Sequence, residues 1–272
     1  MSISLKKQVP SLYLGGDQTV KFTYEGERYC VHVHDDECPD NPRNWGEPAT
    51  MACFHRRYRL GDDVGTSDPE EFWRELVSEF VTDSELVAAV QAGAVYGMNA
   101  TDYDDAQWMA DDMREDLTIR NCQELLQPYL EWLPLWLYDH SGITMSCGTR
   151  TYPYNDAWDS GCVGWIIMTK KTALMERIGC CDASNWREKA VADMEAEVKL
   201  YDQYLTGEVY GYTLLKEEGG EWVEEESIWG FYGDDVMENG ISDSVPGLAE
   251  AVKSGNYDVG EAKRQVSVSY AY

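Results

Sequence analysis

The stretch QTVKFTYEGERYCVHVHDD, residues 18–36, decides the fold class of this chain. It consists of two runs in which apolar and polar residues alternate, separated by Glu25 and Gly26. Alternation with a period of two places successive side chains on opposite faces of a β-strand. A two-residue connection that contains glycine joins antiparallel strands. The stretch therefore predicts a β-hairpin that turns at Glu25 and Gly26.

The rest of the chain alternates in blocks between strand-like and helix-like patterns. Further strands are expected at residues 50–60, 133–139, 142–147 and 162–170, in a hairpin at 208–233 that turns at Gly219–Gly220, and in the tail at 264–272. Helices are expected at residues 67–81, 83–95, 103–117, 120–133, 184–206 and 246–255, and Pro128 is expected to interrupt or kink the fourth of them. Blocks of hairpins and helices without a βαβ rhythm indicate an α+β fold. We expect a mixed or antiparallel sheet flanked by about five to six helices. We expect one compact domain, residues 1–272, with a possible helical insertion at 67–133.

The net charge is the outlying property of the composition. The chain has 50 Asp and Glu against 22 Lys and Arg, a formal charge of −28 and a pI near 4.3. Such a charge argues against direct binding of nucleic acid and against docking on an anionic membrane. No apolar run has the 18 or so residues that a membrane span needs. Residues 1–16 lack the apolar segment of a secretory signal, so we expect a cytoplasmic protein.

The acidic residues are clustered, and these clusters are the candidate partner-binding surface. On a helix, an i, i+4 step rises about 6 Å, so a stripe of carboxylates can follow a row of phosphates, which duplex DNA carries at about one per 1.7 Å of axis. The aromatic residues among them would supply binding energy, namely Tyr103, Trp108, Trp222 and Trp229. The candidate residues are Asp104, Asp105, Trp108, Asp111, Asp112, Glu115, Asp116, Glu224, Glu225, Asp234 and Asp235. A solvated acidic face, high solubility and adaptation to a high-salt cytoplasm are the alternatives.

Three of the four histidines lie in residues 30–63 and suggest a second type of site. Alternation places His32 and His34 on one face of their strand. If the strand at 50–60 pairs with it, His55 would join them, and Asp36 at the strand end would complete a site for a divalent metal. The alternative is that these histidines are half-buried and hydrogen-bonded to nearby carboxylates. In that case the chain needs no cofactor.

The arginines of the same region also allow two interpretations. Arg43, Arg56 and Arg57 are unusual in so acidic a chain. One interpretation is that they form buried ion pairs with Asp35, Asp36, Asp40 or Asp62. The other is that they line a pocket for an anion or phosphate.

The consecutive residues Asp139, His140 and Ser141 suggest a catalytic triad, but neighbours in a chain point apart. They predict a turn between two strands. No GxSxG, P-loop, GxGxxG or HExxH motif is present, so the sequence argues against an enzyme without excluding one.

Several motifs together resemble a group of uncharacterised proteins encoded by bacteriophages and other mobile elements. They are HDDECPDNPR (34–43), TMACFHRRYRLGD (50–62), LPLWLYDHSGITM (133–145), WDSGCVGWI (158–166), YDQYLTGEVYGY (201–212) and WGFYGDD (229–235). The resemblance implies a phage or mobile-element protein in a host cytoplasm. It assigns no activity and no functional residues.

Charge, clustering and resemblance lead to one functional expectation. The chain would be an anti-defence protein, which binds and inhibits a basic, nucleic-acid-binding host protein of the restriction or CRISPR type by mimicking DNA phosphates. The alternative is a metal-dependent or nucleotide-handling enzyme, or a nucleotide sponge, centred on His32, His34 and His55. The sequence leaves the partner and the oligomeric state open.

Overall fold

The computed structural model describes residues 10–99, 109–148, 158–175 and 184–261. The described residues form two antiparallel sheets, of five and four strands, and eight α-helices, which confirms the α+β class. The chain divides into two compact units. Unit 1 comprises Met1–Pro42 and Asp202–Tyr272, and unit 2 comprises Arg43–Tyr201. Whether the chain folds as one domain, as the sequence suggests, stays a prediction.

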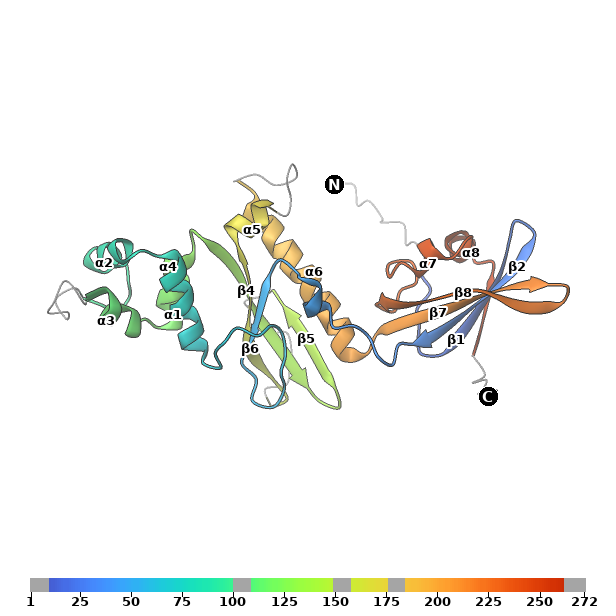
Figure 1. Ribbon diagram of the computed structural model, residues 1–272, viewed down its shortest axis with the longest axis horizontal. Helices are drawn as coiled ribbons and strands as arrows, with labels where there is room; N and C mark the ends of the chain where they lie inside the picture. The colour runs from blue at the N-terminus through green and yellow to red at the C-terminus, as the bar shows by residue number, and fades with distance from the viewer. Residues whose placement is uncertain (1–9, 100–108, 149–157, 176–183, 262–272) are drawn as a thin grey trace, which may run out of the picture. The chain divides into compact units, whose positions relative to one another are not determined.

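Unit 1 is built on a five-stranded sheet that contains both expected hairpins. Its strand order is β8-β7-β2-β1-β9, from β1 (Gln18–Tyr24), β2 (Glu27–Asp35), β7 (Val209–Glu218), β8 (Glu221–Tyr232) and β9 (Tyr257–Glu261) (Figure 1). Glu25 and Gly26 have φ angles of 50° and 87°, and Gly219 and Gly220 have 62° and 92°. Two consecutive residues with positive φ are what a type I′ hairpin turn requires. Both turns are therefore where the sequence predicts them.

One face of this sheet carries the core of unit 1. Val31 and Val33 on β2 and Tyr212 on β7 are at most 1% exposed. They pack with residues of α7 (Ile241–Ser244) and α8 (Leu248–Ser254), which lie on that side of the sheet (Figure 1). In the described part of unit 1 no helix covers the opposite face. Trp229, which lies on that face, is 50% exposed.

Unit 2 combines a four-stranded sheet with most of the helices. The sheet order is β3-β6-β4-β5, from β3 (Thr50–Cys53), β6 (Ser160–Thr169), β4 (Leu130–Asp139) and β5 (Ile143–Cys147). Four helices lie in the chain between β3 and β4: α1 (Pro69–Phe80), α2 (Asp83–Gln91), α3 (Met109–Glu115) and α4 (Ile119–Leu126). Trp73 on α1 is fully buried edge-on against Trp132 and Trp165 of the sheet, with ring centroids 5.6 and 5.5 Å away. This contact joins the helices to the sheet.

All six expected helices are present, and two short ones were not expected. The latter are α5 (Lys170–Met175) and α7; the long helix α6 (Trp186–Thr206) ends at Gly207, as predicted. The helix expected at 120–133 ends earlier, before Pro128, and β4 begins at Leu130. The strand expected at 264–272 lies outside the described residues.

The strand expected at residues 50–60 is shorter than predicted. It ends at Cys53, because the chain then loops out and returns to its own strand. The backbone N–H of Asp62 donates to the carbonyl of Met51 at 2.8 Å, and Gly61 forms a bridge with Ala52. Residues 54–60 are thus a loop, after which Gly61 and Asp62 pair with Ala52 and Met51 of β3. A strand pattern alone does not reveal such a return.

A buried ion-pair network holds this return in place. Arg43, in the short 3-10 helix η1 (Pro42–Trp45), donates two hydrogen bonds to Asp62, at 2.9 and 2.7 Å. It also donates to Glu197 on α6 at 2.7 Å and to the carbonyl of Ala49 at 2.6 Å. The Arg43 side chain is only 4% exposed. Pairing of Arg43 with Asp62, one of the alternatives from the sequence, is confirmed.

The two carboxylates of the network share one cation, so one of them is under-compensated. Glu197 is the more buried, with 6% of its side chain exposed against 24% for Asp62. Burial raises the pKa of Glu197 above its ordinary value, although hydrogen bonds from Arg43 and from the Ala49 N–H oppose the shift. Both carboxylates also accept backbone N–H groups, Asp62 from Met51 at 2.7 Å. The network therefore holds the backbone at Ala49 and Met51 in place, in addition to pairing the buried charges.

Replacing Arg43 with Met should lower the free energy of unfolding by about 3–5 kcal/mol, because it leaves two carboxylates without their cation. Arg43→Lys should lower the free energy of unfolding by less than Arg43→Met does. It keeps the positive charge, but an ammonium group cannot form the two-pronged contact with Asp62. Urea unfolding measures both. Arg120→Met is the matched control, because Arg120 is 73% exposed, pairs with the exposed Glu124 and lies over the ring of Tyr96. A loss no larger than that of the control would contradict this role for Arg43.

The raised pKa of Glu197 predicts a pH dependence. A carboxyl whose pKa is higher in the folded state than in the unfolded state favours folding below its unfolded pKa of about 4.3. This contribution is lost as the pH rises through the folded pKa. The free energy of unfolding of the wild type minus that of Glu197→Gln should therefore fall with rising pH above about 4. Urea titrations at several pH values test this, with the exposed Glu79→Gln as a flat control; a rising difference would overturn the assignment.

Candidate functional site

A histidine and a tryptophan stack across a glycine on the open face of the five-stranded sheet. In the strand register His34 of β2 is opposite Gly211 of β7, and Gly211 is opposite Trp229 of β8. The rings of His34 and Trp229 are 5.9 Å apart and inclined by 26°. A Cβ atom on Gly211 would lie 2.2 Å from the Trp229 ring. Glycine at position 211 is therefore what allows the indole to lie over the middle strand.

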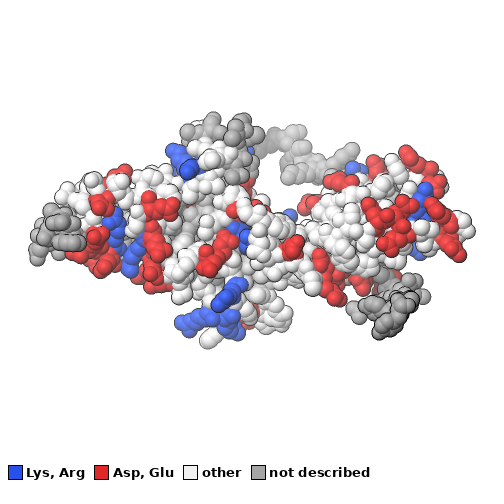
Figure 2. Space-filling view, in the orientation of Figure 1, with Lys and Arg blue, Asp and Glu red and all other residues white. Residues whose placement is uncertain are grey.

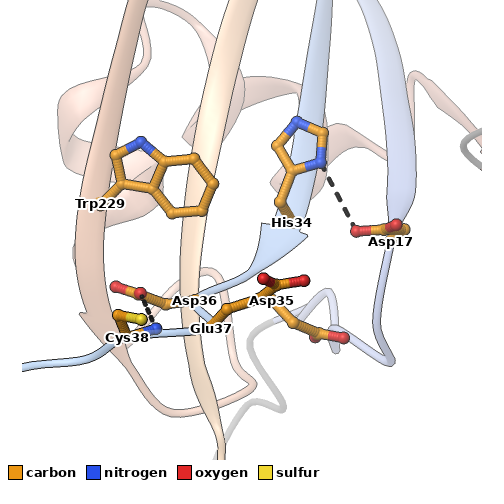
Figure 3. A pocket seen from close by; sticks show the side chains of 7 residues that line it. All are labelled: Asp17, His34, Asp35, Asp36, Glu37, Cys38 and Trp229. Atoms are coloured by element: carbon orange, nitrogen blue, oxygen red, sulfur yellow. Dashed lines mark hydrogen bonds and ion pairs between the residues drawn. The ribbon is translucent and has the colours of Figure 1, made fainter. Parts of the chain in front are cut away.

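This ring pair forms one wall of an acidic pocket of about 610 Å³. Its lining residues are Asp17, His34, Asp35, Asp36, Glu37, Cys38 and Trp229. Figure 3 shows the two rings side by side, with Asp35, Asp36 and Glu37 grouped beyond them at the end of β2. Asp17, just before β1, contacts the Nδ1 atom of His34 at 3.5 Å. Asp36 accepts the N–H of Cys38 at 3.0 Å, which shapes the turn after β2.

The pocket has a marked charge imbalance. Of the residues that the structure describes, four carboxylates line it and neither Lys nor Arg does. Trp229 is 50% exposed, and in the described part of the chain no Lys or Arg lies over its ring. Cations bind favourably over indole faces, and neighbouring carboxylates add to the attraction. The arrangement thus has the features of a binding site for a cationic group.

The same sheet face contains a comparable arrangement whose cations come from the chain itself. Lys21 and Arg28 lie over the ring of Trp222, at 5.7 and 5.5 Å from its centroid. Arg28 also pairs with Glu217 at 2.6 Å. Trp222 therefore shows, within this protein, how an arginine sits between an indole and a carboxylate. Trp229 offers the indole and the carboxylates without the arginine.

The acidic residues that the sequence proposed for partner binding differ in their exposure. Asp111, Asp112, Glu115 and Asp116, on and just after α3, are exposed. Asp111 is paired with Arg114 at 3.4 Å. Glu224 and Glu225 are exposed on the edge strand β8, and Asp234 is half-buried. Asp104, Asp105 and Trp108 lie outside the described residues.

Asp235 is a correction to the proposed surface. It is only 9% exposed, and its side chain accepts the N–H of Met237 at 2.9 Å. Its backbone carbonyl accepts two further N–H groups, from Glu238 and Asn239. Asp235 therefore stabilises the turn after β8 and is not available to a partner.

The three-histidine arrangement proposed for a metal is also corrected. His32 and His34 do share a face of β2, with ring centroids 6.2 Å apart. His55, however, follows β3, which pairs with β6 in the other sheet and not with β2. Its Nδ1 atom accepts N–H groups of Arg57 and Tyr58, both at 3.3 Å. Within the described residues no three His, Cys, Asp or Glu side chains are arranged to hold a metal ion.

Sequence reasoning missed the parts of the site that come from distant segments. Asp17 lies before the first strand, and Gly211 lies in a strand nearly 200 residues later in the chain. A glycine within a strand pattern is a signal of close approach by another group, and VYGYT at 209–213 carries that signal. Trp229 was proposed as an interaction residue, but its pairing with His34 depends on the strand order.

Comparisons with known proteins add no assignment. No family model matches the chain, and neither the curated proteins nor the solved structures contain a significant match. Among the described helices, none combines the length and apolar character that crossing a bilayer requires.

Replacing Gly211 with Val should displace the Trp229 ring and cost about 1–3 kcal/mol, because the added side chain would occupy the space of the indole. In protein labelled with 5-fluorotryptophan, the ¹⁹F resonance that Trp229→Phe removes should move in Gly211→Val. Gly15→Ala is the control, since a Cβ at Gly15 meets nothing within 4 Å. A Trp229 resonance that stays in place in Gly211→Val would contradict the stacked geometry.

Proposed function

We propose that this chain is a binding protein whose partner is a basic, nucleic-acid-binding protein. The observation that supports the proposal is the pocket around Trp229, which an exposed indole and four carboxylates line and which no described Lys or Arg lines. An arginine or lysine of the partner would sit over Trp229, as Arg28 sits over Trp222. Arginine is favoured, because its flat guanidinium both stacks on aromatic rings and forms two-pronged contacts with carboxylates.

A second acidic surface on unit 2 supports a partner of the same chemistry. Asp112, Glu115 and Asp116 project from α3 and the residue after it, and they are exposed. Figure 2 shows Asp and Glu spread over the helical part of unit 2 and over unit 1, with few Lys and Arg between them. Carboxylates spaced along a helix present negative charge much as a phosphate backbone does. Proteins that bind DNA phosphates therefore have the charge to bind this surface.

The biological setting of the proposal rests on the motifs from His34 to Asp235 that resemble phage and mobile-element proteins. In that setting the partner is a host defence protein of the restriction or CRISPR type, and binding inhibits it. The chain would act in the host cytoplasm by occupying the partner's phosphate-binding surface. No catalytic step is needed for this function.

The metal-enzyme alternative has less support. It requires His55 to join His32 and His34, and the strand pairing that would bring them together is not formed. The pKa of His32 is lowered by burial and by the neighbouring His34 and Lys21, so its ring is neutral near pH 7. A neutral imidazole suits a metal ligand, but it is equally what a half-buried histidine adopts.

The test uses immobilised chain and purified restriction endonucleases and nucleoid proteins, in competition with duplex DNA. The proposal predicts binding that DNA displaces and that weakens steeply between about 50 and 200 mM salt. The triple variant Asp17→Asn, Asp36→Asn, Glu37→Gln and the single variant Trp229→Ala should each weaken binding at least about tenfold.

A matched triple variant separates the site from net charge alone. Glu79→Gln, Asp243→Asn and Glu250→Gln remove three exposed carboxylates elsewhere, so the overall charge changes equally. This control should retain most of the binding. If both triple variants lost the same binding affinity, binding would depend on the net charge and not on the Trp229 pocket, which would contradict the proposed site. The absence of binding at low salt would refute the proposal.

A further inference from the structure

The loop after β3 carries the most unusual cations of the protein. Arg56, Arg57 and Arg59 lie within four residues of one another, and all three are exposed. Seven of the nine described arginines form an ion pair with Asp or Glu. Within the described part of the chain, Arg56 and Arg59 are the exceptions. Figure 2 shows the resulting patch of Lys and Arg below the sheet of unit 2, where the loop lies.

Unpaired arginines are unexpected in a chain with 50 acidic and 22 basic residues. With carboxylates in such excess, an exposed arginine normally finds one nearby, as Arg120 does with Glu124 at 2.9 Å. Two neighbouring arginines without such a partner keep ten N–H donors available for an external anion. The patch therefore runs against the charge of the whole molecule.

A pocket of about 260 Å³ opens beside this patch. His55 and Arg57 line one side of it, and Asp139, Asp159 and Ser160 line another. Both carboxylates already have partners. Asp139 accepts from Arg57 at 2.6 Å and from the Tyr58 hydroxyl at 3.2 Å, and Asp159 contacts the Nδ1 atom of His140 at 2.8 Å. Their negative charge is thus partly offset before any ligand arrives.

Aromatic rings lie next to the same cations. The ring of Tyr58 stacks on His55 at 5.0 Å, with an interplanar angle of 8°, and Arg57 lies over Tyr58 at 5.6 Å. Trp158 also lines the pocket and is 96% exposed. Exposed aromatic rings beside arginines are the combination that binds a nucleotide base and its phosphate together. Its parts come from the loop after β3 and from the segment that enters β6.

We propose that the Arg56–Arg59 loop and the adjoining pocket bind a mononucleotide, with Arg56 and Arg59 on its phosphates and the exposed ring of Trp158 on its base. This site lies within unit 2 and shares no residue with the acidic pocket around Trp229. It is independent of the basic partner proposed above, and either proposal can fail without the other.

The test is a thermal-shift and calorimetric titration of the full chain with ATP, AMP and inorganic phosphate. A ligand that binds only the folded state raises the melting temperature, and the shift grows with the ratio of ligand concentration to Kd. ATP should bind more tightly than AMP, because it offers more phosphate oxygens to the arginines. Inorganic phosphate should bind more weakly than either, because it has no base to stack on the ring of Trp158.

The variant Arg56→Ala, Arg59→Ala should weaken ATP binding at least about tenfold, since each arginine supplies charge-assisted hydrogen bonds. Neither residue has an ion pair in the described chain, so folding should be unaffected. Arg28→Ala, Arg120→Ala is the matched control, because it removes two exposed arginines elsewhere and should leave ATP binding unchanged. Arg56→Lys, Arg59→Lys should restore part of the affinity.

Three results would overturn the proposal. The first is the absence of a thermal shift with ATP up to about 10 mM, where even a weak site would be filled. The second is an equal loss of binding in the two double-alanine variants, which would make the effect one of net charge. The third is equal affinity for inorganic phosphate and ATP, which would leave no role for the ring of Trp158 and would refute a nucleotide site.

Discussion

The shortage of cations is the constraint on which the rest of this structure depends. With 22 basic residues for 50 acidic ones, the position of each arginine decides where negative charge can be buried. Arg43 makes it possible to bury Glu197 and to hold Asp62 against the backbone of Met51. Without that cation the segment from η1 to α1 would have no fixed path against α6. One guanidinium thus links η1, the return at Asp62 and α6.

The presence or absence of a neighbouring cation also distinguishes the two tryptophans on the open face of the five-stranded sheet. Lys21 and Arg28 lie over the ring of Trp222, and Arg28 also pairs with Glu217, so the chain itself supplies cations at this ring. Trp229 is surrounded by Asp17, His34 and the acidic end of β2, with no described cation over its ring. High solubility alone would explain many scattered carboxylates. High solubility does not explain why four carboxylates lie around the exposed indole of Trp229. It also does not explain the glycine at position 211, which makes room for that indole.

Local sequence patterns predicted most elements, whereas the sites depend on contacts that such patterns do not contain. The hairpins at Glu25–Gly26 and Gly219–Gly220 and the cap of α1 at Asp68 follow from a few neighbouring residues. The pairing of β3 with β6 rather than β2 joins residues more than 100 positions apart, and it assigns His55 to a different sheet from His34. Glu197 as a partner of Arg43, and Asp17 as a partner of His34, are likewise long-range. Asp235 was misjudged because an aspartate in a turn reads the same whether it faces solvent or caps the turn.

The central claim is that the Trp229 pocket receives a cation from outside the chain. Its most direct measurement is an NMR titration of the protein with N-acetyl-arginine amide, following the indole N–H signals of Trp229 and Trp222. The account predicts saturable shifts at Trp229 and at the backbone of residues 35–38, with little change at Trp222, whose ring its own cations cover. Shifts of equal size at both tryptophans, or none at Trp229, would contradict it.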